Sequence, residues 1–294
     1  MRVPNIVWWG SLSPNTQGAL WMLCSAFFLS AMSATLKQAS LSLNVWQLLL
    51  VRSIFALFLL LPALVQGNFC QLRTRVFPLH IMRGCLGTCA FACYFIALSK
   101  IELALTVTLG FTRNLFIVIF AIFVLKEIVK WRRITATAIG FSGVLICIQP
   151  GSESASLWAL LAVGYGFFAA SVTIVVKRLT DTESSISVLF YMYCFMGLIA
   201  FISAIVNWKP LALMELVMIG RVALFSTAGQ MCTVNALRVG ETTVVAPFEY
   251  TRILYAVIFG FILFGEIAGI NTWIGALIII SSTLYISLRN QTNT

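Results

Sequence analysis

One apolar stretch, Val244–Glu266, has the length of a membrane span but carries charged residues within it. A helix needs about 20 residues to cross the hydrocarbon core of a bilayer, and this stretch is long enough. Pro247, Glu249 and Arg252 lie inside the apolar run. Ionisable side chains are costly in lipid, so they usually face the interior of a helix bundle or a water-filled cavity. We therefore expect this stretch to line the inside of a helical membrane protein.

The same stretch has a copy earlier in the chain. Shifted back by 139 residues it aligns with Leu105–Glu127, and Arg252 then falls on Arg113. Other identical pairs are Thr112 and Thr251, Phe120 and Phe259, Glu127 and Glu266, and, just upstream, Glu102 and Glu241. An arginine inside an apolar run is uncommon, so its repetition at a fixed spacing indicates an internal repeat.

Composition places the whole chain in the membrane class. Of its 294 residues, 61% are hydrophobic and only 10% are charged, whereas a soluble domain has about 25% charged residues. Ten apolar runs follow one another, and each must be helical because lipid offers no partner to an unpaired peptide group. The runs are Gly18–Leu36, Trp46–Val65, Pro78–Leu98, Leu103–Leu125, Ile134–Ile148, Leu157–Val176, Ile186–Val206, Ala212–Leu237, Thr243–Phe264 and Thr272–Leu288.

The distribution of basic residues predicts the orientation. With both termini in the cytoplasm, the inner segments contain eleven Lys and Arg residues, from Arg2 to Arg289. The outer segments contain only Lys37, Lys100 and Lys209. Lys and Arg are enriched in cytoplasmic loops, so this orientation is strongly favoured. The basic residues lie at helix ends or within spans, not on a soluble surface, so nucleic acid is not expected as a partner.

The loop Gln149–Ser156 divides the ten runs into two sets of five. Because five is odd, the second set enters the membrane from the opposite side. We therefore predict an all-α membrane protein of ten transmembrane helices, arranged as two inverted five-helix repeats, 18–149 and 157–289. Inverted repeats with a binding site near the midplane are typical of secondary transporters. A duplicated bundle that acts only as a scaffold or sensor is the alternative.

Several short motifs are spread over nearly the whole chain, and they are Lys37, Arg52, Arg83-Gly84, Ala97-Leu98, Gly110-Phe111-Thr112, Leu125-Lys126-Glu127, Gly140–Leu145, Gln149-Pro150-Gly151, Ala246–Tyr250 and Phe264-Gly265-Glu266. Together these motifs resemble the EamA branch of the drug/metabolite transporter superfamily. The resemblance implies ten helices with cytoplasmic termini, a central cavity between the repeats, and transport of small polar metabolites. Family members commonly have proline in the fourth span where this chain has Asn114, whereas Pro247 is retained in the ninth. A helix break on one side only is therefore expected.

The candidate site centres on two arginines. Arg113 and Arg252 lie about ten residues into their spans, which places both near the midplane at 1.5 Å per residue. A guanidinium offers a fixed charge and a fork of donors that matches a carboxylate or phosphate. The arginines are therefore candidate clamps for a substrate anion, with a helix-packing role as the alternative. Glu249 lies three residues before Arg252, on the same helix face, so either an internal ion pair or a proton-linked site is expected.

Other residues near this site are candidates on weaker grounds. Pro247 removes a backbone donor, so it is a candidate hinge, with a static kink as the alternative. Tyr250, Tyr94 and Trp21 are candidates to stack on a planar or cationic substrate, with packing or lipid contact as the alternative. Arg52, near the outer face, is a further candidate for substrate binding, and snorkelling to the lipid headgroups is its alternative.

No nucleophile–base set, phosphate loop or metal-ligand cluster is visible, so neither an enzyme nor a cofactor or metal site is expected. We predict a transporter of an amino-acid-like or cofactor-like metabolite in a bacterial inner membrane. Leu189-Phe190-Tyr191 and Ala246-Pro247-Phe248 show some likeness to S-adenosylmethionine uptake carriers. An exporter of amino acids, a membrane sensor and a lipid-carrier flippase are the alternatives, and a homodimer is left open.

Overall fold

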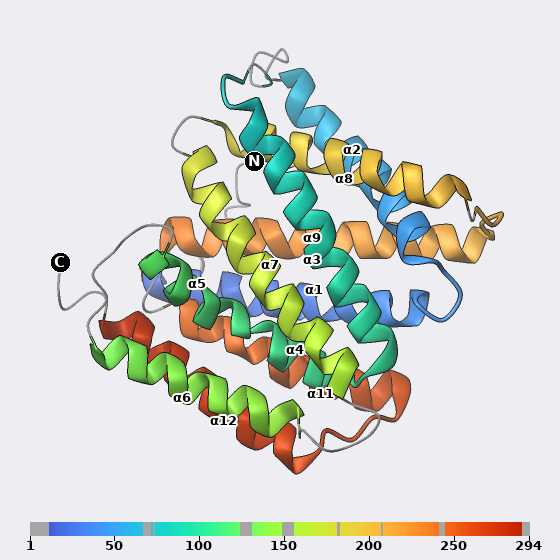
Figure 1. Ribbon diagram of the computed structural model, residues 1–294. Coiled ribbons are helices and arrows are strands. Elements are labelled where there is room, and N and C mark those ends of the chain that lie inside the picture. The colour runs from blue at the N-terminus through green and yellow to red at the C-terminus, as the bar shows by residue number, and fades with distance from the viewer. Residues whose placement is uncertain are drawn as a thin grey trace.

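The computed structural model consists of helices and their connections, with no strand in the residues that it describes, namely 12–66, 72, 74–123, 131–148, 156–180, 183–206, 208–240 and 245–289 (Figure 1). The helices are α1 (Pro14–Ala39), α2 (Val45–Gln66), α3 (Phe77–Lys100), α4 (Leu103–Gly110), α5 (Thr112–Phe123), α6 (Trp131–Ile148), α7 (Ser156–Thr180), α8 (Ser185–Val206), α9 (Leu213–Val239), the 3₁₀ helix η2 (Ala246–Tyr250), α11 (Thr251–Phe264) and α12 (Ile270–Arg289).

Seven helical stretches among these residues are long and apolar enough to cross a membrane. They lie on α1, α2, α3, the α4–α5 pair, α7, α8 and α9. The predicted class, an all-helical membrane protein, is therefore confirmed. The other three apolar runs of the sequence correspond to α6, α12 and the η2–α11 pair, whose length alone does not establish a span.

The helices pack in a pattern that repeats. Helix α1 packs along α9 as α3 packs along α7, and α11 contacts α1 as α5 contacts α7. Further contacts join α2 to α8 and α6 to α12, at opposite ends of the molecule in Figure 1, and α3 to α8 and α2 to α9. Each of the first five apolar runs has a counterpart among the last five. When every helix is replaced by its counterpart, α1–α9 becomes α7–α3 and α1–α11 becomes α7–α5, while α2–α8 and α6–α12 remain the same pairs. Two copies of one five-helix unit that face each other would pack in this way.

Two helices depart from regular geometry at matching positions. Helix α4 ends at Gly110, Phe111 forms a turn, and α5 begins at Thr112. In the second half η2 ends at Tyr250 and α11 begins at Thr251. Phe111 and Tyr250 are 139 residues apart, so both breaks fall at the same position of the repeat.

The expectation of a break on one side only is therefore wrong. The second break follows Pro247, as expected for a residue without a backbone donor. The first break has no proline, but Gly110 is a poor helix former, which costs about 1 kcal/mol relative to alanine. An added Cβ on Gly110 would lie 3.0 Å from Cε1 of Tyr165, so α7 packs directly onto the break. Glycine and a close helix neighbour thus accompany the break where proline is absent.

Candidate functional site

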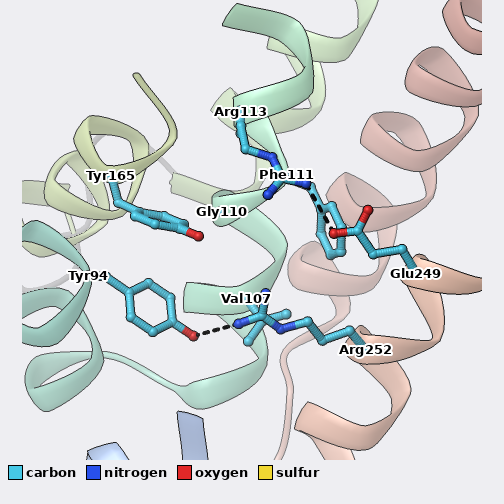
Figure 2. A pocket seen from close by; sticks show the side chains of 8 residues that line it. All are labelled: Tyr94, Val107, Gly110, Phe111, Arg113, Tyr165, Glu249 and Arg252. Atoms are coloured by element: carbon cyan, nitrogen blue, oxygen red, sulfur yellow. Dashed lines mark hydrogen bonds and ion pairs between the residues drawn. The ribbon is translucent and has the colours of Figure 1, made fainter. Parts of the chain in front are cut away.

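A small pocket lies where the two broken helices meet (Figure 2). It encloses about 250 Å³ of empty space, including the part open to solvent. Its walls come from α3, from both sides of the first break, from α7 and from both sides of the second break. The lining residues are Tyr94, Val107, Gly110, Phe111, Arg113, Tyr165, Glu249 and Arg252. The two predicted arginines, Glu249 and Tyr94 are therefore brought together.

Arg113 is paired with Glu249 across the pocket. Its Nη2 donates to Oε1 of Glu249 at 3.0 Å, so the contact is both a hydrogen bond and an ion pair. The two side chains are 29% and 26% exposed, which leaves the pair half-buried. The carboxylate therefore neutralises the guanidinium of the other repeat. Among the described residues Glu249 forms no ion pair with Arg252, its neighbour on the same helix face.

Arg252 has neutral partners instead. Its Nη2 donates to the hydroxyls of Ser33, at 3.2 Å, and of Tyr94, at 3.3 Å. Those two hydroxyls also bond to each other at 2.7 Å. The Nε of Arg252 is buried, and no hydrogen-bond partner is found for it in the described part of the chain. Hydroxyls solvate the guanidinium but do not cancel its charge, so the pocket carries one uncompensated positive charge.

Aromatic rings form the rest of the pocket. The ring centroids of Tyr94 and Tyr165 lie 4.8 Å apart. The two rings lie on the side of the pocket opposite the helices that carry Glu249 and Arg252 (Figure 2). Phe111 packs against Tyr250, with 4.9 Å between ring centroids. Because these two residues occupy the same position of the two repeats, their contact lies at the junction between the repeats. Asn114 also donates to the hydroxyl of Tyr250 at 3.4 Å.

The other sequence-predicted candidates lie outside this pocket's lining. Tyr250 contacts the lining residue Phe111 but does not itself line the pocket. Trp21 packs with Met22, Ala236 and Val245 in a separate hydrophobic cluster. Arg52 lies 4.5 Å above the ring of Phe91, and its Nε is buried without a partner among the described residues. Pro247 lies in η2, and its side chain is outside the described residues.

Sequence reasoning missed three contributors to the site. Ser33 bonds Arg252 from α1, and Tyr165 and Phe111 supply rings. Phe111 could have been found, because it is the repeat equivalent of the candidate Tyr250. Ser33 and Tyr165 carry no comparable signal, since one serine or tyrosine in an apolar helix is common.

A second polar cluster joins the ends of the broken spans. Lys37, at the end of α1, forms an ion pair with Glu266 and donates to the carbonyl of Ile101 at 2.7 Å. The other oxygen of Glu266 accepts from the backbone N–H of Leu103, the first residue of α4, at 2.8 Å. Glu266, two residues beyond the end of α11, therefore ties this end of the span to the start of α4. Its repeat equivalent, Glu127, lies outside the described residues.

Comparison with known proteins gives a consistent picture. Residues 16–149 and 156–288 both match the EamA-like transporter family. The chain is 30% identical over 247 residues to a riboflavin transporter of Brucella anthropi, covering 81% of this chain and 86% of that protein. It is 28% identical to an S-adenosylmethionine uptake transporter of Rickettsia bellii, covering 94% and 95%. It is 24% identical to the pseudopaline exporter CntI of Pseudomonas aeruginosa, covering 92% and 95%.

Proposed function

Because this chain belongs to the EamA-like transporter family, and is a transporter rather than an enzyme, we propose that it moves a small polar metabolite across a bacterial inner membrane by alternating access. In this proposal ten helices form two inverted repeats, 18–149 and 157–289, and both termini are cytoplasmic. The reciprocal packing of α1 with α9 and α3 with α7 supports the repeat. The excess of basic residues in the inner segments supports the orientation.

The observation that carries the proposal is the uncompensated guanidinium of Arg252 beside a pocket. A cation with only hydroxyl partners in a low-dielectric site is unfavourable unless a ligand supplies the missing charge. A substrate carboxylate would gain charge-assisted hydrogen bonds from the fork of donors. The rings of Tyr94 and Tyr165 would contact an apolar or planar part of the same molecule.

This chemistry favours an amino-acid-like or cofactor-like substrate. S-adenosylmethionine, which the R. bellii relative takes up, carries a carboxylate and a planar ring. Riboflavin, which the B. anthropi relative transports, has a planar ring but no carboxylate. The pocket therefore suits the first compound better. The likeness to the exporter CntI makes export of a carboxylate-bearing metabolite the second candidate function.

The size of the pocket implies that it must open. Only about 10 Å³ of the pocket can hold the centre of a water molecule, which is roughly the room that one water molecule needs, so a metabolite does not fit. We propose that the structure represents a closed form in which Glu266 and Lys37 hold α1, α4 and α11 together. Opening would separate these helices and widen the pocket.

Counterflow in proteoliposomes tests the transport proposal. Vesicles preloaded with unlabelled S-adenosylmethionine should accumulate the labelled compound with wild-type protein and not with Arg252→Ala. Arg221→Ala is the matched control, because Arg221 is exposed on α9 and does not line the pocket. Accumulation by the Arg252→Ala variant would contradict the proposed site. If folded wild-type protein shows no counterflow with S-adenosylmethionine, amino acids, flavins or carboxylates, the result would contradict the carrier proposal and favour a sensor or flippase.

A further inference from the structure

Each repeat contributes one arginine to the pocket, but only the second repeat contributes a carboxylate. Arg113 and Arg252 occupy the same position of the repeat, whereas the equivalent of Glu249 is Gly110. Tyr165 packs against this glycine, with its Cε1 3.0 Å from a Cβ added there, so a longer side chain would have to displace the ring. The first repeat therefore supplies no carboxylate at this position, and the pocket has two arginines and one glutamate.

This arrangement fixes the charge of the pocket. Among its lining residues only Arg113, Glu249 and Arg252 carry charge at neutral pH. Glu249 bonds Arg113 at 3.0 Å and leaves Arg252 to Ser33 and Tyr94. The excess charge is therefore one positive unit, and it is located at Arg252. Without the Glu249 carboxylate, both guanidiniums would lack an acidic partner within the pocket.

Resting on the proposed function, we infer that Glu249 is a specificity-determining residue that limits the site to one substrate anion. It acts as an internal carboxylate that occupies Arg113, so only Arg252 is available to the substrate. A compound with two anionic groups places its second group near Arg113 and Glu249, where the carboxylates repel each other. The role of Glu249 is thus to reject dianions as well as to stabilise the pocket.

The test uses a reagent and two probes that do not depend on the natural substrate. Butane-2,3-dione modifies accessible guanidinium groups, and peptide mass spectrometry measures the rate at each arginine. The probes are propionate and malonate, which have three carbons each but one and two carboxylates. Wild type, Glu249→Gln and the charge-retaining Glu249→Asp are compared in detergent, with size-exclusion chromatography as the check on folding.

In wild type we expect Arg252 to be modified faster than Arg113, and propionate to protect Arg252 at least as well as malonate at equal concentration. In Glu249→Gln the modification of Arg113 should rise to the rate of Arg252. At both arginines the ratio of protection by malonate to protection by propionate should then be about ten times the wild-type ratio. A tenfold change is the size expected for one close charge interaction. Glu249→Asp should keep the wild-type preference.

Three results would overturn the inference. They are equal modification of both arginines in wild type, no protection of Arg252 by either acid, and a malonate-to-propionate ratio that does not change in Glu249→Gln. Failure of the transport proposal would appear differently, as wild-type silence in counterflow with the protection pattern intact. The two proposals can therefore fail separately.

Discussion

The helix breaks at α4–α5 and η2–α11 lie at the same position of the repeat, but the arginines that follow them have partners of different charge. Each contains an arginine two residues after its central aromatic residue, Phe111 or Tyr250. The first arginine is paired with a carboxylate, whereas the second is bonded by hydroxyls. The helix break and the cation are thus common to both halves, and the counter-ion is not. In the proposed mechanism the matching breaks would serve alternating access, and the difference in charge would give the site its selectivity.

The largest difference between the two breaks should appear when each arginine is removed. Arg252→Ala should weaken anion binding about a hundredfold, since charge-assisted bonds contribute about 1.5–3 kcal/mol each. The thermal stability of the Arg252→Ala variant should not fall, because the substitution removes a cation that has no acidic partner in the pocket. Arg113→Ala should instead lower stability by about 1–2 kcal/mol, because it leaves Glu249 unpaired in a half-buried position. Anion binding and thermal unfolding measure the two effects, and the same phenotype in both variants would contradict the asymmetry.

The close approach of α7 to the first break gives the next effect. An added Cβ on Gly166 would collide with Oγ1 of Thr112 and lie 3.0 Å from the backbone nitrogen of Arg113. Gly166→Ala should therefore destabilise the protein by about 1–3 kcal/mol, the usual cost of overpacking. Gly220→Ala on α9 is the control, because no atom lies within 4 Å of the added Cβ. Equal unfolding midpoints for the two variants would show that α7 does not constrain the break.

The polar cluster that joins the ends of the two broken spans should have a smaller effect on stability. Glu266 is 19% exposed and Lys37 12% exposed, so their ion pair is partly shielded from solvent. In a double-mutant cycle Lys37→Met and Glu266→Gln should show a coupling of about 1 kcal/mol, within the range for neighbouring partners. Both variants should also speed counterflow exchange if this pair holds the closed form. Additive effects on stability would indicate that the contact contributes little.

The smallest expected effect is a pH dependence at Glu102, beside this cluster. Burial raises the pKa of its carboxyl and Glu266 adds to the shift, whereas Lys37 and a backbone hydrogen bond from Gly269 oppose it. The folded protein therefore holds this proton more tightly than the unfolded chain. Its contribution to stability is complete below the ordinary value of 4.5 and is lost as pH rises through the raised pKa.

The Glu102→Gln variant has no ionisable group at this position, so it does not lose this part of the folding stability when the pH rises. The unfolding midpoint should therefore rise by about 1 °C at pH 8 and be unchanged at pH 4. Thermal unfolding of wild type and the variant at the two pH values is the measurement. A lower midpoint in the variant at pH 8 would mean that the charged carboxylate is stabilising, against this account.

Sequence predicted the helical membrane class and the meeting of Arg113 with Arg252, because composition and an intramembrane repeat carry that information directly. The partner of Glu249 was not predictable from spacing. Residues three apart share a helix face, but the opposing helix supplied a closer cation. Proline does not predict the first break, because Gly110 and the neighbouring Tyr165 accompany it instead. Contacts between helices depend on their relative rotation, which one sequence does not reveal.

Removing the internal ion pair as a whole tests whether Arg252 is the cation that binds the substrate. The double variant Arg113→Ala/Glu249→Ala keeps the net charge of the pocket and leaves Arg252 as its cation. Counterflow should be measured with a compound that the wild type exchanges, beside Arg252→Ala and the control Arg221→Ala. We predict that the double variant exchanges the compound at close to the wild-type rate, while Arg252→Ala does not. Loss of exchange in a folded double variant, with activity retained in Arg252→Ala, would contradict the assignment of Arg252 as the substrate-binding cation.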